Sequence, residues 1–145
     1  MNNSELFDSD SFYKAFERDL RSAKHSVIIE SPFITSRRME YLLPILIKLR
    51  RNGVRVVVNT RDPKEHNEEY AIQAEDVIAT MQEIGVKVLY TVKHHRKLAI
   101  IDGEILWEGS LNILSQNDSC EFMRRIQSGI LAKQMLDFIG MRKWL

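Results

Sequence analysis

Helix-like and strand-like segments alternate from residue 11 to residue 90, and this alternation strongly limits the folds open to the chain. Apolar residues recur at helical spacing over residues 11–24, 37–52 and 67–84. Each of these segments is followed by a short apolar run rich in β-branched residues, at 27–29, 54–59 and 86–90. Helices that alternate with strands in this way favour a parallel sheet with helices packed against it.

The pattern changes after residue 90. Two apolar runs, 97–101 and 105–107, are joined by Asp102-Gly103, a dipeptide typical of a tight β-hairpin turn. We expect one more strand and one more helix, at about 121–127 and 128–140. The sequence therefore predicts an α/β fold with a mixed, mainly parallel central sheet, flanking helices and a β-hairpin.

Two of the predicted helices contain residues that affect where they begin. Asp10 or Ser11 is a candidate cap for the first helix, because short polar side chains accept hydrogen bonds from free backbone amides. In the second helix, Pro44 removes one backbone hydrogen bond. We therefore expect its first part to be irregular and regular helix to start near Leu43.

The composition is that of one ordinary globular domain covering residues 1–145. The chain is 44% hydrophobic and 28% charged, with a net charge of +1. Its single cysteine, Cys120, excludes an intrachain disulfide and favours a reducing compartment. The apolar runs are too short to span a bilayer, and the first ten residues do not resemble a signal peptide. We expect a cytoplasmic domain without a membrane partner, which can be part of a longer protein.

His95 and Lys97 stand at the start of the predicted hairpin. Residues two apart in a strand point to the same face, so an imidazole and an ammonium project side by side. Such a pair can act as a nucleophile or acid beside an anion clamp. Taken alone, the pair is better explained as a solvated sheet face near a strand end.

A second polar cluster, Gly109-Ser110-Leu111-Asn112, follows the hairpin. Glycine lets the backbone approach a ligand closely, and the serine and asparagine offer a hydroxyl and an amide. A helical turn starting here would also present free backbone amides to an anion. The simpler alternative is a tight turn with Asn112 as a helix cap.

The two clusters together form the string His95-x-Lys97, four residues, Asp102, six residues, Gly109-Ser110-x-Asn112. This string resembles the HKD signature of the phospholipase D superfamily at every fixed residue and at both gaps. The order of helices and strands from about residue 11 to 140 also resembles one half of that superfamily's two-lobed fold. The chain is similar in size to the small bacterial nucleases of the superfamily, which carry one motif per chain.

The resemblance implies a role for each residue of the motif. His95 would attack phosphorus and form a phosphohistidine, while Lys97 and Asn112 would bind the non-bridging oxygens. Ser110 would help to shape the phosphate pocket. Asp102 and Gly109 would be structural, and the Asp-Gly turn already gives Asp102 a local explanation.

Glu121 is a further catalytic candidate. A histidine nucleophile needs a neutral Nε2, so its Nδ1 must donate a proton to a carboxylate or a carbonyl. Related proteins often place a glutamate after the motif for this purpose, and Glu121 lies nine residues after Asn112. The alternative is a polar strand residue paired with Arg124 or Arg125. No Cys/His cluster has zinc spacing and no acidic loop suggests calcium, so we predict neither a metal nor a cofactor.

The superfamily site needs two copies of the motif, and this chain carries one. The resemblance therefore implies a homodimer in which the two histidines face each other across a two-fold axis. Nucleic acid is the expected substrate, because basic residues near the motif suit a phosphate backbone, and we expect DNA more than RNA. These candidate nucleic-acid contacts are Lys93, Arg96, Arg124 and Arg125.

Two alternatives to a nuclease remain open from the sequence. One is a phospholipase or another phosphodiesterase. The other is a non-catalytic module that binds nucleic acid or a protein. The runs at residues 31–34, 42–44 and 105–112 resemble phospholipase D-type domains of helicase-like and DNA-defence proteins. The chain is thus expected to be free-standing or the nuclease domain of a larger helicase-like protein.

Overall fold

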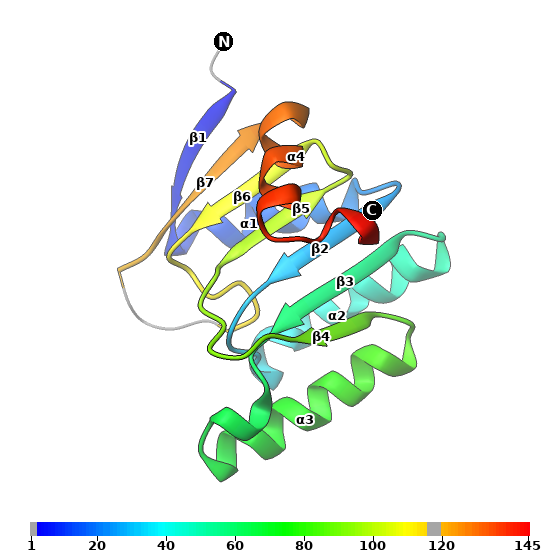
Figure 1. Cartoon of the computed structure of the whole chain (residues 1–145), viewed down its shortest axis with the longest axis vertical. Coiled ribbons are helices and arrows are strands. Elements are labelled where there is room, and N and C mark those ends of the chain that lie inside the picture. Colours follow the sequence, from blue (N-terminus) through cyan, green and yellow to red (C-terminus); the bar gives the residue numbers. More distant parts are fainter. Residues whose placement is uncertain (1–2, 116–119) are drawn as a thin grey trace.

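The protein forms three layers, with a sheet between two sets of helices (Figure 1). The computed structural model describes residues 3–115 and 120–145. The sheet has seven strands in the order β1-β7-β6-β5-β2-β3-β4. Their bounds are Ser4–Asp8 (β1), Ser26–Glu30 (β2), Arg55–Thr60 (β3), Lys87–Tyr90 (β4), Leu98–Ile101 (β5), Ile105–Gly109 (β6) and Phe122–Gln127 (β7).

In the described part of the chain, four α-helices cover the sheet. The helices α1 (Ser9–Arg21), α2 (Ser36–Arg51) and α3 (Glu68–Glu83) pack on one face, and α4 (Gly129–Phe138) packs on the other. Two short 3-10 turns, η1 (Pro63–Glu65) and η2 (Arg142–Trp144), complete the described elements. None of the described helices combines the length and apolarity needed to cross a membrane.

The sheet is mixed, as the sequence predicts. Parallel pairing joins β2 to β3 and β3 to β4, which are the strands of the alternating region. The strands after β4 instead pair antiparallel, with β5 inserted against β2 and followed by β6 and β7. Antiparallel pairing therefore extends further than the sequence suggested, because four of the six pairings between the described strands are antiparallel. The Asp102-Gly103 turn has the two positive φ angles, 56° and 63°, that tight hairpin turns favour.

Each face of the sheet has its own apolar core. The larger core lies under α1, α2 and α3 and contains Phe12, Phe16 and Trp107, all fully buried. The smaller core lies under α4 and contains Leu98, Ile100 and other apolar residues. Because successive residues of β5 point to opposite faces, this strand contributes to both cores and is fixed from both sides.

The N-terminal region differs from the prediction. Residues 4–8 form the edge strand β1, which pairs antiparallel with β7 and was not predicted. The α1 helix begins at Ser9, and its cap is Asp8 rather than Asp10 or Ser11. The Asp8 carboxylate accepts from the Ser11 amide at 2.9 Å, and the Ser11 hydroxyl accepts from the Asp8 amide at 3.1 Å. This reciprocal pair is a capping box.

The expected irregularity before Leu43 is wrong, since α2 is continuous from Ser36 and includes Pro44. Pro44 is exposed, and so is Glu40, whose carbonyl lacks its helical partner. Water can satisfy that carbonyl, so the helix tolerates the proline without an interruption.

Candidate active site

The segment that carries His95 and Lys97 is an extended stretch between β4 and β5. It follows a turn in which Lys93 has a positive φ of 55°. The strand itself begins at Leu98, one residue later than predicted, so both side chains come immediately before the sheet. The buried residues Leu98, Ala99 and Ile100 then anchor the segment on its C-terminal side.

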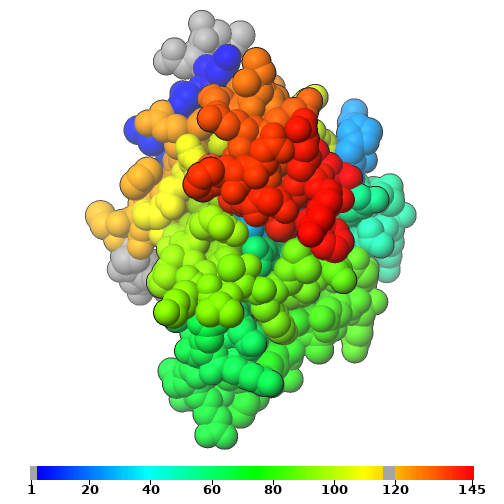
Figure 2. Space-filling model, in the orientation of Figure 1, coloured from blue at the N-terminus to red at the C-terminus, as the bar shows by residue number. Residues whose placement is uncertain are grey.

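His95 and Lys97 line one groove of about 540 Å³. The groove lies between the segment that leads into β5, the end of β6 with the following Ser110, the start of β7 and the end of α4. In Figure 2, the yellow-green surface around the start of β5 lies below the orange-red surface of α4. The lining residues are His95, Arg96, Lys97, Leu98, Glu108, Gly109, Ser110, Phe122, Arg124, Met135 and Phe138.

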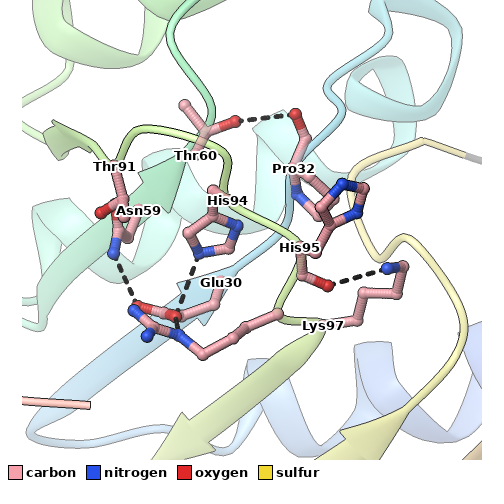
Figure 3. Close-up of polar contacts among 9 residues, drawn as sticks. Glu30, Pro32, Asn59, Thr60, Thr91, His94, His95 and Lys97 are labelled. Atoms are coloured by element: carbon pink, nitrogen blue, oxygen red, sulfur yellow. Dashed lines mark hydrogen bonds and ion pairs between the residues drawn. The ribbon is translucent and has the colours of Figure 1, made fainter.

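The two motif side chains lie on the same side of the segment, as predicted, and point away from Glu30 (Figure 3). The Lys97 ammonium donates to the backbone carbonyl of His95 at 2.8 Å. This contact holds a positive charge beside the imidazole. A ligand anion in the groove can therefore meet a nitrogen nucleophile and a cation together.

Gly109 and Ser110 bring β6 and β7 together at the groove. The Ser110 amide donates to the Phe122 carbonyl at 3.0 Å, and the Ser110 hydroxyl accepts from the Phe122 amide at 3.1 Å. A Cβ at position 109 would lie 2.2 Å from the Phe122 carbonyl oxygen, a distance that real atoms do not reach. Gly109 is thus required by the close approach of β7.

Asn112 and Glu121 are not among the residues that line the groove within the described part of the chain. Asn112 is half-buried, and its backbone carbonyl accepts from the Tyr13 hydroxyl at 3.2 Å. The Ser115 amide donates to the same carbonyl at 3.0 Å, so a hydrogen-bonded turn begins at Asn112. Glu121 is also half-buried and directly precedes β7.

Asp102 has a structural role that reaches beyond its turn. Its carboxylate accepts hydrogen bonds from the backbone amides of Lys24, His25 and Ser26, at distances of 2.7 to 3.2 Å. It therefore ties the β5–β6 turn to the loop between α1 and β2. The local explanation from the Asp-Gly turn is correct but incomplete.

The four basic residues predicted to contact nucleic acid lie in three different places. Arg96 and Arg124 line the groove, and Arg124 also donates to the Ser4 hydroxyl. Lys93 lines a neighbouring cavity of about 420 Å³ that also includes His95.

Arg125 makes a two-pronged ion pair with Asp19, through Nε at 2.6 Å and Nη2 at 3.1 Å. Asp19 belongs to α1 and also accepts from the buried Trp107 indole, so Arg125 faces away from the groove. The expectation that Arg125 contacts nucleic acid is therefore corrected, and its partner is an acidic residue that the sequence analysis did not single out.

Sequence analysis also missed a buried polar network around Glu30 at the end of β2 (Figure 3). Glu30 is fully buried and binds His94, Arg96 and Asn59. Burial alone would raise the pKa of Glu30, but the hydrogen bonds from these three side chains outweigh it and hold the pKa below its ordinary value. A glutamate at the end of an otherwise apolar strand is the signal that could have found this network.

Among residues 3–115 and 120–145, no group of three or more His, Cys, Asp or Glu side chains is placed to hold a metal ion. The polar groups of the groove are an imidazole, cations and a hydroxyl, together with the Glu108 carboxylate. This set suits a ligand that carries an anionic, oxygen-rich group.

Solved structures that share the fold include those of the following three proteins. Nuc, a phospholipase D family member from Salmonella typhimurium, matches with a TM-score of 0.72 and 19% identity, over 93% of this chain and 90% of Nuc. NucT from Helicobacter pylori matches with a TM-score of 0.76 and 18% identity, over 97% and 94%. Phosphatidylserine synthase from Haemophilus influenzae matches with a TM-score of 0.78 and 14% identity, over 95% of this chain and 36% of the synthase.

Family comparison gives a match over most of the chain. The family described as "Cardiolipin synthase, PLD-like domain" matches residues 16–140. No curated protein matches the sequence. The matched region contains the groove, the complete motif and most residues of both apolar cores. The chain therefore belongs to the phospholipase D-like domain family, within the phospholipase D superfamily.

Proposed function

We propose that this protein is a nuclease that cleaves phosphodiester bonds of nucleic acid, with DNA as the preferred substrate and without a metal ion. The observation that carries the proposal is the shared groove of His95 and Lys97, which Arg96 and Arg124 also line. Repeated cations along a groove suit the regularly spaced phosphates of a nucleic-acid backbone.

The proposed reaction has two steps at phosphorus. In the first, His95 Nε2 forms a bond to phosphorus while the bond from phosphorus to the leaving oxygen breaks. In the second, water attacks phosphorus and the bond to nitrogen breaks, which regenerates the histidine. Lys97 and the Asn112 amide are proposed to stabilise the non-bridging oxygens, and Glu121 to accept a hydrogen bond from the Nδ1–H group of His95.

The leaving oxygen needs a proton, and a single copy of the motif has no second histidine to supply it. We propose that the same histidine of a second copy donates this proton across a two-fold axis and regains a proton from the attacking water in the second step. The apolar rim of the groove supports such a contact, because Phe122 is 53% exposed and Phe138 is 82% exposed. Large exposed aromatic side chains beside a site are typical of interaction surfaces.

A lipid phosphodiester is the second candidate substrate, and the same apolar rim favours it. Leu98, Met135 and the two phenylalanines could take acyl chains while His95 meets the headgroup phosphate. The nuclease proposal is stronger. In a dimer, the partner copy would cover the apolar rim, so the rim would not need a lipid. The cations of the groove would still need a polyanion.

The substrate is tested in excess EDTA with single- and double-stranded DNA, RNA and a phosphatidylcholine analogue. We expect the wild-type chain to cleave nucleic acid and the His95→Ala and Lys97→Ala variants to lose at least about 10³-fold in kcat. Cleavage of lipid alone would move the assignment to the second candidate. Cleavage that needs a divalent ion, or that survives His95→Ala, would contradict the mechanism.

The dimer is tested separately by light scattering at the concentration of the activity assay. We expect a mass of twice the chain. A fully active monomer would contradict the shared site while leaving the nucleophile intact.

A further inference from the structure

Glu30 lies at the centre of a buried network whose members come from three separate parts of the chain, namely β2, β3 and the stretch between β4 and β5. The Asn59 amide, from β3, donates to Glu30 Oε2 at 2.7 Å. Its own oxygen accepts from the Thr91 hydroxyl at 2.9 Å, so the orientation of the amide is fixed. On the other carboxylate oxygen, Oε1, the His94 Nε2 and Arg96 Nε atoms converge (Figure 3).

The two residues that bind Glu30 alternate with the two motif residues. The segment 94–97 is extended, so neighbouring side chains point to opposite sides. His94 and Arg96 meet the carboxylate, while His95 and Lys97 point away from it and line the groove. A single buried oxygen therefore determines on which side of the segment the motif side chains lie.

Other hydrogen bonds hold the segment mainly at its ends. The Lys93 amide donates to Glu65 at 3.1 Å, and the His94 amide donates to the Thr91 carbonyl at 3.3 Å. At the far end, the Gly109 amide donates to the Lys97 carbonyl at 3.3 Å. Between these anchors, the side chains of His94 and Arg96 provide the attachment to the rest of the protein.

The His94 imidazole depends on Glu30 for its hydrogen bonding. Its side chain is fully buried, and its other nitrogen, Nδ1, has no hydrogen-bond partner in the described residues. Because Nε2 faces a carboxylate, it carries the proton. Removing the carboxylate would leave a buried imidazole and the Arg96 guanidinium without their acceptor, an arrangement that drives the segment to another conformation.

We propose that Glu30 is a positioning residue of the active site, and that its carboxylate holds His94 and Arg96 so that His95 and Lys97 face the groove. This inference rests on the proposed function, because turnover at His95 is its main readout. Glu30 does not contact the substrate in this account and acts through the segment.

The first test compares two buried carboxylates on opposite sides of the sheet. Glu30→Gln removes the charge that holds the motif segment. Asp19→Asn is the matched control, because Asp19 is 6% exposed and also binds an arginine and an aromatic partner, but far from the segment. We expect Glu30→Gln to lower kcat by about 10- to 100-fold with KM changed less than about threefold.

For Asp19→Asn we expect a lower stability but a kcat within about twofold of wild type, per folded molecule. Equal losses of kcat in both variants would show that Glu30 is merely structural and would overturn the proposal. A Glu30→Gln enzyme with wild-type kcat would overturn it as well.

The second test uses conservative variants of His94, which keep the proposal testable if Glu30→Gln fails to fold. The glutamine in His94→Gln can still donate a hydrogen bond to Glu30, whereas the leucine in His94→Leu cannot. We expect His94→Gln to retain several times the kcat of His94→Leu. Equal values of kcat for the two variants would contradict a role that depends on this hydrogen bond.

The third test does not depend on turnover and separates this proposal from the proposed function. NMR order parameters of the amides of residues 94–97 report how firmly the segment is held. We expect them to fall in Glu30→Gln and to stay unchanged in Asp19→Asn. If the wild-type chain cleaves no phosphodiester, the proposed function fails, and unchanged order parameters in Glu30→Gln would separately overturn the positioning role.

Discussion

The carboxylate of Asp102 lies 2.7 Å from the backbone nitrogen of His25, a residue 77 positions earlier in the chain. The amides of Lys24 and Ser26 donate to the same carboxylate. The turn of the β5–β6 hairpin is thereby fixed to the start of β2. Because β5 follows His95 and Lys97 directly, this contact stabilises the strand that anchors the motif.

Asp102→Asn should weaken this attachment. Asparagine tolerates the left-handed backbone of this position but provides one uncharged oxygen in place of a carboxylate. We expect the free energy of unfolding in urea to fall by about 1–2 kcal/mol, with kcat per folded molecule nearly unchanged. Loss of activity at unchanged stability would indicate that Asp102 takes part in the chemistry.

Gly109→Ala should damage the groove. The new methyl group would lie 2.2 Å from the Phe122 carbonyl oxygen, so β7 must shift and carry Arg124 with it. We expect unfolding in urea to show a loss of about 2 kcal/mol or more, accompanied by a lower kcat.

Gly53→Ala is the control for Gly109→Ala. Its φ of 80° is strained for alanine, but no other atom lies within 4 Å of the new Cβ. We expect a cost of about 1–2 kcal/mol from backbone strain alone and a normal kcat. If Gly109→Ala has a normal kcat too, the approach of β7 does not shape the site.

Arg124 and Arg125 are neighbours in sequence but should behave differently. Arg124 lines the groove, so Arg124→Ala should weaken DNA binding and reduce the slope of log Kd against log salt by about 1. Arg125→Ala should instead destabilise the fold, by about 2 kcal/mol, because the buried Asp19 loses its ion pair. Fluorescence anisotropy at several salt concentrations measures DNA binding, and urea unfolding measures stability. If Arg125→Ala weakened DNA binding and Arg124→Ala destabilised the fold, the two roles would be refuted.

Stability at acidic pH should depend on Glu30. Its hydrogen bonds hold the pKa of the folded state below the ordinary value of 4.5, so the unfolded chain binds more protons as pH falls through this range. Glu30 thus contributes stability that is complete above pH 4.5 and is lost at lower pH. We expect the unfolding free energy of wild type to fall more steeply below this pH than that of Glu30→Gln, and parallel curves would contradict the charged network.

The sequence predicted the elements whose patterns are local. Three helices and the strands of the alternating region have strong periodicity. From the spacing of the motif we also expected His95 and Lys97 to lie side by side, and both line one groove. The edge strand β1 was missed because its residues, Ser-Glu-Leu-Phe-Asp, are mostly polar and its partner strand, β7, lies far away in the sequence.

The remaining parts of the site depend on contacts between distant segments. The role of Glu30 requires Asn59 and His94, which the fold brings together from positions 29 and 64 residues away. The pairing of Arg125 with Asp19 depends on the packing of α1 against β7. Neighbouring side chains of a strand point to opposite faces, so the sequence could have predicted different surroundings for Arg124 and Arg125. It could not have identified Asp19 as the acidic partner of Arg125.

The proposed mechanism requires His95 to form a covalent bond to phosphorus. The direct measurement is a rapid quench, in base and in excess EDTA, of the protein reacting with DNA labelled at the scissile phosphate, followed by peptide mapping. We expect a transient label that is stable in base, labile in acid and located on the peptide containing His95. Turnover without any such label, or a label on another residue in the His95→Ala variant, would contradict it.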